Sequence, residues 1–233
     1  MMSLYSILIL CSLALPLVLS FDKKLQFYKQ WKYLFPAIIL VAFFYIAFDI
    51  YFTKLGVWGF NARYHSNILL FKLPLEEWLF FIVIPYASIF LHDSVVLYFN
   101  KFQINRKQAN IVSAILIFIS LLLVFFNFEK AYSSYILITV IVVLSASFFD
   151  SSDTINSYYI TFLIILIPFI AVNAILTGSF IDEPVVWYNN SENFGIRFLT
   201  IPIEDFGYAF SLILFNLLLR VKVKALFIKL KQN

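Results

Sequence analysis

Two short acidic motifs contain the residues best suited to chemistry. Each places two adjacent carboxylates after a proline, and the motifs lie 128 positions apart. They are LPLEEW (73–78), which holds Glu76 and Glu77, and IPIEDF (201–206), which holds Glu204 and Asp205. Proline and acidic residues are also typical of the first turn of a helix, where the helix dipole favours negative charge. Repetition of both pairs in register favours a functional site over simple capping, because ionisable groups near a bilayer are usually functional.

The sequence around these motifs is that of an integral membrane protein. Of its 233 residues, 63% are hydrophobic and 13% are charged, and the mean hydropathy is +0.92; soluble domains are roughly 25% charged. Apolar stretches of about 20 residues predict an all-α fold with seven transmembrane helices. The predicted spans are 3–20, 34–53, 76–98, 109–128, 131–149, 157–177 and 203–221. We expect the first span to be retained and not cleaved as a signal peptide, and its lone Cys11 excludes a disulfide framework.

Positive charge is distributed unequally between the two ends of these spans. Twelve of the 17 Lys and Arg residues fall in the loops 21–33 and 99–108 and in the tail from Arg220. The positive-inside rule therefore predicts a multi-pass protein of the cell membrane, with a non-cytoplasmic N-terminus and a cytoplasmic C-terminus. The net charge of +4 is explained by this topology and by contact with lipid headgroups. We expect no nucleic-acid partner.

The chain contains an internal duplication. The offset of 128 residues that relates the two motifs also aligns the first span with the fifth. When a short gap is allowed between these anchors, Asp49 aligns with Asn173 and Trp58 with Trp187. Each half therefore holds three predicted helices, and one helix is left over between them.

This extra helix decides how the halves are arranged. We expect a first repeat at 1–100, a linker helix at 101–130 and a second repeat at 131–233. Three helices reverse the direction of the chain, and the linker restores it, so the repeats are predicted to be parallel. Both acidic motifs would then lie at the same depth on the same side and face a single cavity.

Helix geometry predicts which member of each acidic pair faces that cavity, because adjacent residues point about 100° apart. Glu204, Tyr208 and Ser211 form one stripe in the last span. We therefore expect Glu204, and by equivalence Glu76, to face inward.

Three further residues near the motifs are candidates for the site. Asp49 comes close to the end of its span and is a third catalytic candidate, with an ion pair to Lys54 as the structural alternative. Trp58 and Trp187 suit an interfacial aromatic belt. Their repetition beside the carboxylates also suits the wall of a cavity.

Sequence motifs for cofactors and metals are missing. The sequence has no Gly-rich nucleotide fingerprint, no P-loop, no zinc-type Cys/His cluster and no lysine in the last span for a retinal Schiff base. We therefore expect neither a cofactor nor a metal. His92 and Asp93 suit a hydrogen-bonded helix interface, with a catalytic role as the alternative. Asp150 and Asp153 suit a helix cap better than a metal site.

The stretch FDIYFTKLGVWGFN (48–61), followed by LPLEEW and by the second motif, resembles the integral-membrane lycopene cyclases. These occur as two small subunits or as fused domains, and each half of this chain is similar to one subunit. The resemblance implies redox-neutral cyclisation of the ψ ends of lycopene to β-ionone rings, through γ-carotene to β-carotene. It implies the catalytic residues Glu76, Glu77, Glu204, Asp205 and Asp49, and substrate contacts from Trp58, Trp187, Tyr208 and Asn173. Asn173 stands where the first half has Asp49, which makes the halves unequal.

The implied chemistry suits buried carboxyl groups. An acid protonates the terminal alkene, the next double bond attacks the cation, and a base removes a ring proton; burial and a like-charged neighbour keep the acid protonated. The expected partners are lycopene or a related linear carotenoid, membrane lipid and other enzymes of the carotenoid pathway. Two rival functions use similar residues: a proton-coupled membrane transporter and a magnesium-dependent prenyltransferase acting on isoprenoid diphosphates. Substrate length and ring type stay open.

Overall fold

The computed structural model describes residues 2–99 and 101–232, and that part of the chain contains seven α-helices. They are α1 (Leu4–Leu19), α2 (Trp31–Leu55), α3 (Leu75–Tyr98), α4 (Arg106–Asn127), α5 (Ala131–Ser147), α6 (Thr154–Leu176) and α7 (Ile203–Leu230). Each predicted span overlaps one helix, which confirms the all-α fold class. Helix α7 extends past the predicted end of the last span, to Leu230, through a basic segment.

The chain is a membrane protein. Four helical segments are long and apolar enough to cross a bilayer: α3, α4, α6, and α2 together with the short 3-10 helix that precedes it (Phe27–Gln30). Helices α1 and α5 are apolar but have only 16 and 17 residues, or about 24–26 Å at a rise of 1.5 Å per residue. Helix α7 is long but carries two carboxylates in its first turn. That all seven helices cross the membrane stays a prediction.

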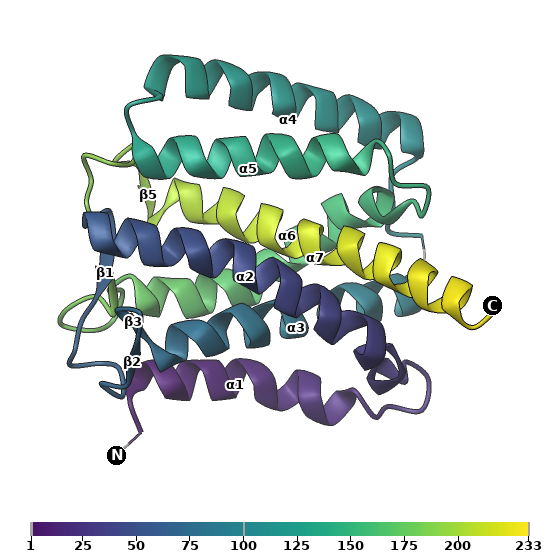
Figure 1. Ribbon diagram of the computed structural model, residues 1–233, viewed down its shortest axis with the longest axis horizontal. Helices are drawn as coiled ribbons and strands as arrows, with labels where there is room; N and C mark the ends of the chain where they lie inside the picture. The colour runs from purple at the N-terminus through teal and green to yellow at the C-terminus, as the bar shows by residue number, and fades with distance from the viewer. Residues whose placement is uncertain (1, 100, 233) are drawn as a thin grey trace.

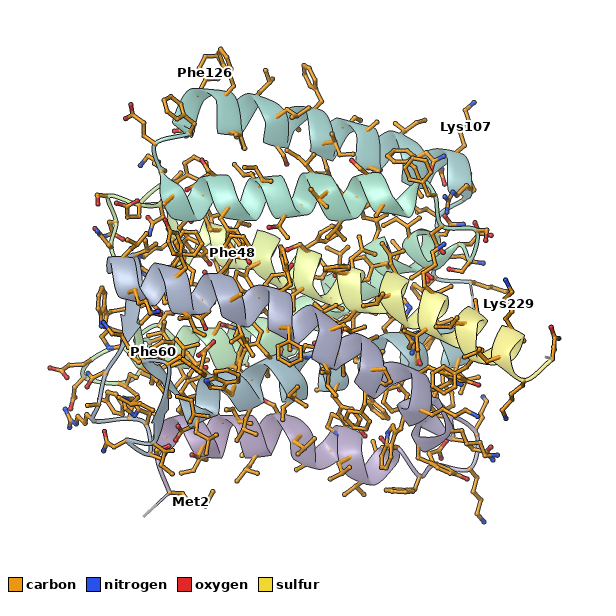
Figure 2. All side chains as sticks on the ribbon, in the orientation of Figure 1. Met2, Phe48, Phe60, Lys107, Phe126 and Lys229 are labelled. Atoms are coloured by element: carbon orange, nitrogen blue, oxygen red, sulfur yellow. The ribbon has the colours of Figure 1, made fainter. Side chains whose placement is uncertain are left out.

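The helices lie side by side, with α4 and α5 along one edge of the bundle and α1 along the other (Figure 1). Helices α1, α3, α5 and α7 all begin at the end where the β-strands gather, which we call the strand end. The remaining helix connections and the C-terminus lie at the opposite end, together with Lys107 and Lys229 (Figure 2); we call this the basic end. The first turns of α3 and α7, which carry the two acidic motifs, therefore lie at the same end of the bundle.

Six short strands at the strand end position these first turns. Strands β2 and β3 form one hairpin and β5 and β6 another, while β1 pairs with β4 across the two halves. Their bounds are β1 (Trp58–Phe60), β2 (Leu69–Leu70), β3 (Leu73–Pro74), β4 (Val186–Tyr188), β5 (Arg197–Phe198) and β6 (Ile201–Pro202). Each hairpin leads directly into its motif helix, so both pairs of carboxylates follow the same local structure.

The β1–β4 ladder joins the two halves at the predicted Trp58–Trp187 pair. It places Gly59 opposite Trp187 and Trp58 opposite Tyr188. A Cβ atom at Gly59 would lie 2.4 Å from the Trp187 ring, so only glycine fits this contact.

Polar pairs hold the helices together towards the basic end. Arg220 on α7 donates two hydrogen bonds, of 2.6 and 2.9 Å, to the Asp93 carboxylate on α3. His92 Nδ1 lies 2.7 Å from Thr161 Oγ1 on α6. Both contacts join different helices, as expected for an interface.

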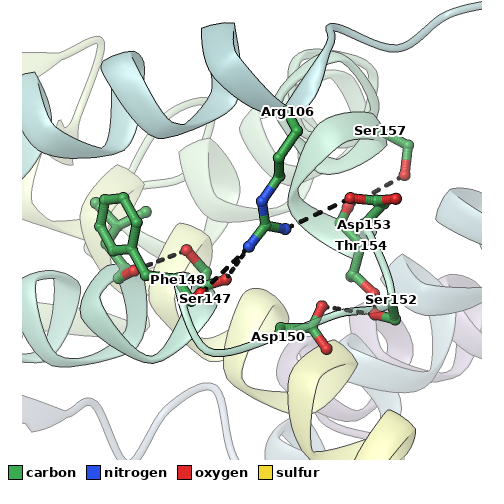
Figure 3. Close-up of polar contacts among 9 residues, drawn as sticks. Arg106, Ser147, Phe148, Asp150, Ser152, Asp153, Thr154 and Ser157 are labelled. Carbon is green, nitrogen blue, oxygen red and sulfur yellow. Dashed lines mark hydrogen bonds and ion pairs between the residues drawn. The ribbon is translucent and has the colours of Figure 1, made fainter.

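The start of α4 is fixed by one arginine. Arg106 donates hydrogen bonds to the carbonyl oxygens of Ser147 and Phe148 at the end of α5, and its guanidinium lies 3.7 Å from Asp153 before α6 (Figure 3). A cation at a helix C-terminus satisfies free carbonyl groups and complements the helix dipole. Arg106 therefore joins α4, α5 and α6 at the basic end. The side chain of Asp150 accepts a hydrogen bond from Ser152 in the same loop.

We predict that both loops of the strand end face away from the cytoplasm. Cysteine introduced at the exposed positions Ala62 and Asn190, in a Cys11→Ala background, should react with a membrane-impermeant thiol reagent in intact cells. Cysteine introduced at Lys231 should react only after the cells are opened. Labelling at one loop but not the other would contradict the parallel arrangement. Labelling at position 231 but at neither loop would show that the strand end faces the cytoplasm.

Candidate active site

An apolar cavity of about 460 Å³ lies between α1, α3, α6 and α7. Ligand sites typically have volumes of about 300–1,000 Å³ and mostly apolar walls with a few precisely placed polar groups. Three carboxyl groups line this cavity near the strand end: Asp49 near the end of α2, Glu77 in the first turn of α3, and Asp205 in the first turn of α7. Carboxyl groups from both halves therefore meet in one space, as the parallel repeats predict.

Asp49 and Glu77 form a carboxyl pair. Their side chains lie within hydrogen-bonding range of each other. Two carboxylates this close cannot both be ionised, so the pair retains a proton. The outer oxygens are held by neutral donors: Tyr5 Oη donates to Glu77 Oε2 at 2.5 Å, and Trp58 Nε1 donates to Asp49 Oδ1 at 2.6 Å. The pair is thus fixed in position and able to supply a proton to the cavity.

Asp205 has a different environment. The hydroxyl of Tyr132 donates to Oδ1, and the hydroxyl of Tyr188 donates to Oδ2 at 3.1 Å. The two tyrosine rings stack, with centroids 5.6 Å apart. In the second half the inner carboxyl group thus lies against two tyrosine hydroxyls, whereas in the first half it lies against another carboxyl group.

The other two motif carboxylates point away from the cavity. Glu76 accepts hydrogen bonds from the hydroxyls of Ser3, Ser6 and Ser66 and, at 2.7 Å, from the Ser66 N–H. Glu204 repeats this arrangement with the Ser133 hydroxyl at 2.6 Å and the Phe194 N–H at 2.7 Å. Both side chains tie the start of a motif helix to a neighbouring helix and loop.

The structure thus reverses the expectation that Glu76 and Glu204 face inward. On α7 the cavity is lined by Asp205, Tyr208, Ala209, Leu212 and Ile213, so Tyr208 of the predicted stripe lines it and Glu204 and Ser211 do not. Ser211, on which the predicted stripe relied, instead accepts a hydrogen bond of 2.9 Å from Tyr45 on α2. A polar residue on a membrane helix can face a neighbouring helix as readily as a cavity, and Ser211 does so.

A family model described as lycopene cyclase matches the chain twice, over residues 2–95 and 129–222. Together the two matches cover well over half of the chain. The protein belongs to the lycopene cyclase family. It is a membrane enzyme of carotenoid cyclisation, and each matched segment contains one set of three helices with one acidic motif. No curated protein and no solved structure matches the chain.

Three of the four predicted substrate contacts line the cavity, and one does not. Trp58, Tyr208 and Asn173 line the cavity. Trp187 lies over Gly59, outside the cavity lining, with 43% of its surface exposed. Asn173 Nδ2 donates to the carbonyl oxygen of Phe169 one turn earlier, so its amide does not repeat the carboxyl contact that Asp49 makes.

Sequence reasoning missed the tyrosines that hold the two inner carboxylates. Tyr5 and Ser6 in the first half correspond to Tyr132 and Ser133 in the second, because each Tyr-Ser pair contacts the acidic pair of its own half. Their separation is 127 residues and not 128, so a fixed offset does not align them. The repeated Tyr-Ser dipeptide at the start of two matching spans was the available signal.

Proposed function

We propose that this enzyme converts the ψ ends of lycopene to β-ionone rings, through γ-carotene to β-carotene, by redox-neutral acid–base catalysis. The observation that carries the proposal is the Asp49–Glu77 carboxyl pair at the end of an apolar cavity. An alkene is a weak base, so its protonation needs an undissociated acid in a site that excludes water. A hydrocarbon substrate needs apolar walls. The cavity combines such walls with the carboxyl pair.

The proposed reaction begins at the Asp49–Glu77 pair. The shared proton is transferred to the terminal double bond of the ψ end, which leaves a tertiary carbocation. The positive charge of the carbocation beside the pair offsets the repulsion between the two carboxylates that this transfer creates. The π electrons of the next double bond along the chain that can reach the cation then form the ring bond, and the positive charge moves into the new ring. No electron is gained or lost, and no atom beyond the proton has been added.

Asp205 is the proposed base. It removes a proton from the ring carbon beside the cation, and the C–H electrons become the ring double bond. Substrate and product are therefore isomers. The proton then returns from Asp205 to the Asp49–Glu77 pair across the polar end of the cavity, where the Tyr188 hydroxyl lies against Asp205. This assignment gives the two halves of the duplicated chain different tasks, which fits their different hydrogen-bond partners.

Aromatic side chains near the carboxyl groups suit the cationic intermediate. Trp58, Phe60, Phe80 and Tyr208 all line the cavity. An aromatic face attracts a cation by its quadrupole, with a gain of about 2 kcal/mol or more in a desolvated site. Unlike a carboxylate or water, an aromatic ring does not trap the carbocation readily, so it stabilises the charge until the base acts.

Expression of the protein in lycopene-accumulating cells tests the proposal. We expect pigment to shift from lycopene to β-carotene, with γ-carotene as the one-ring intermediate, as measured by chromatography of extracted pigments. Purified protein in lipid vesicles should retain the activity after treatment with a chelator and without added flavin or nicotinamide. Unchanged lycopene despite membrane insertion would refute the cyclase, and loss of activity with the chelator would favour the prenyltransferase class.

A further inference from the structure

The cavity continues well beyond the carboxyl groups. Along α3 its lining runs from Glu77 to Leu91, which at 1.5 Å per residue is a length of about 21 Å. Along α1 it runs from Tyr5 to Pro16. The three carboxyl groups lie at the strand end, and the walls beyond them are largely apolar. The cavity is therefore a long apolar slot with a single reactive end.

This slot opens sideways on the surface of the bundle. Four residues that line it are also exposed: Cys11 and Leu15 on α1, and Pro168 and Ala171 on α6. Leu15 is 65% exposed. All four lie within apolar helices and away from the helix ends, so the surface around them faces hydrocarbon. We call this gap between α1 and α6 the side opening.

The corresponding flank of the other half is packed shut. There α5 takes the place of α1 and α2 takes the place of α6. Three aromatic rings fill the space, with Phe48 and Tyr135 centroids 4.6 Å apart and Phe52 and Tyr135 centroids 5.2 Å apart. None of these three rings lines the cavity.

The duplication shows which residues keep the first flank open. If Asp49 is aligned with Asn173, then Phe48 aligns with Val172 and Phe52 with Leu176. If Tyr5 is aligned with Tyr132, then Tyr135 aligns with Leu8. All three aliphatic residues line the cavity. Smaller side chains at three matched positions thus leave open on one flank the space that aromatic rings fill on the other.

We propose that a linear polyene enters from the lipid through the side opening between α1 and α6 and presents only one of its ends to the carboxyl groups at a time. This inference rests on the proposed function. The carboxyl groups occupy one end of the slot, whereas the substrate has two equivalent ends. A second ring therefore requires the chain to leave through the opening, turn around and enter again, so the one-ring intermediate is released into the membrane.

Cys11 provides a native reporter on the rim of the opening. Purified protein is treated with a pyrene maleimide or with a reagent that adds only a methylthio group, and is then returned to vesicles that contain lycopene. We expect the bulky adduct to lower the initial rate by about tenfold or more, a change of about 1.4 kcal/mol in the barrier, and the small adduct to have much less effect. Cys11→Ala should be insensitive to both. The matched control, Leu10→Cys in the Cys11→Ala background, carries its adduct on an exposed neighbour outside the lining.

A second pair of variants tests the α6 side of the opening. Ala171→Trp places a large ring at an exposed position of the lining, whereas Ile167→Trp places it on the same helix at a position that is 71% exposed and outside the lining. We expect only Ala171→Trp to slow conversion. It should do so with normal insertion and with slower exchange of carotenoid between the protein and added vesicles.

Protection of Cys11 from labelling tests entry through the side opening independently of the reaction. Lycopene in the vesicles should slow the labelling of Cys11 but not of the thiol that Leu10→Cys introduces in the control variant, and this protection does not require catalysis. Absence of any ring formation by the unmodified protein would refute the proposed function alone. Full activity of the pyrene adduct and of Ala171→Trp, or conversion to β-carotene with no γ-carotene transferable to acceptor vesicles, would overturn the side opening with one-end access.

Discussion

Glu77→Gln is expected to lower the rate of cyclisation by about 10²–10⁴-fold, the contribution typical of a general acid or base. Glutamine keeps the size of the side chain and can still accept the Tyr5 hydrogen bond, but it cannot hold the proton shared with Asp49. Initial rates of ring formation in lipid vesicles, normalised to the amount of inserted protein, measure the change. Asp49→Asn should have an effect of similar size, because it removes the other half of the same pair.

Glu76→Gln is the matched control for this variant. Its side chain is adjacent in sequence but contacts serine hydroxyls and a loop N–H instead of the cavity. We expect it to weaken the anchoring of α3, with lower thermal stability and a smaller loss of rate. A larger loss in Glu76→Gln than in Glu77→Gln would move the acid to the outer carboxylate. Wild-type activity in both variants would show that the two glutamates only cap the start of α3.

Asp205→Asn is expected to cause a loss in the same range, about 10²–10⁴-fold, because an amide cannot accept the ring proton. The residual product is as informative as the rate. The position of the base decides which ring proton is removed, so its loss should raise the proportion of products with a displaced ring double bond. Chromatographic separation of β, γ and ε rings measures this directly.

Two further variants serve as controls for Asp205→Asn. Tyr188→Phe keeps the aromatic ring and removes one hydrogen bond to Asp205, so we expect an intermediate loss of rate. Glu204→Gln changes the carboxylate that is held by Ser133 and the Phe194 N–H, and should mainly affect stability. An unchanged rate in Asp205→Asn would remove Asp205 from the mechanism and leave the Asp49–Glu77 pair to act as both acid and base.

The general fold could be predicted from the sequence because apolar stretches of membrane length leave little choice of secondary structure. The location of both acidic motifs at one end also followed from counting helices. The helix that contains the last predicted span continues beyond it to Leu230, through basic residues that an apolar pattern does not include.

The choice between adjacent carboxylates could not be made from one helix alone. Ser211 suggested a polar stripe with Glu204, but Ser211 contacts Tyr45 on α2. Which face of α7 meets the cavity depends on how α2 packs against it, and a single helix contains no information about that neighbour.

The closed flank limits how a second route to the carboxyl groups could be made. Truncation of a buried aromatic side chain typically costs about 3–5 kcal/mol, because a cavity is left behind. Phe52 and Tyr135 are buried and Phe48 is partly buried, so replacing these rings with small side chains should destabilise the α2–α5 flank. Engineering a second route would require all three rings to be reduced together, in a variant stabilised elsewhere.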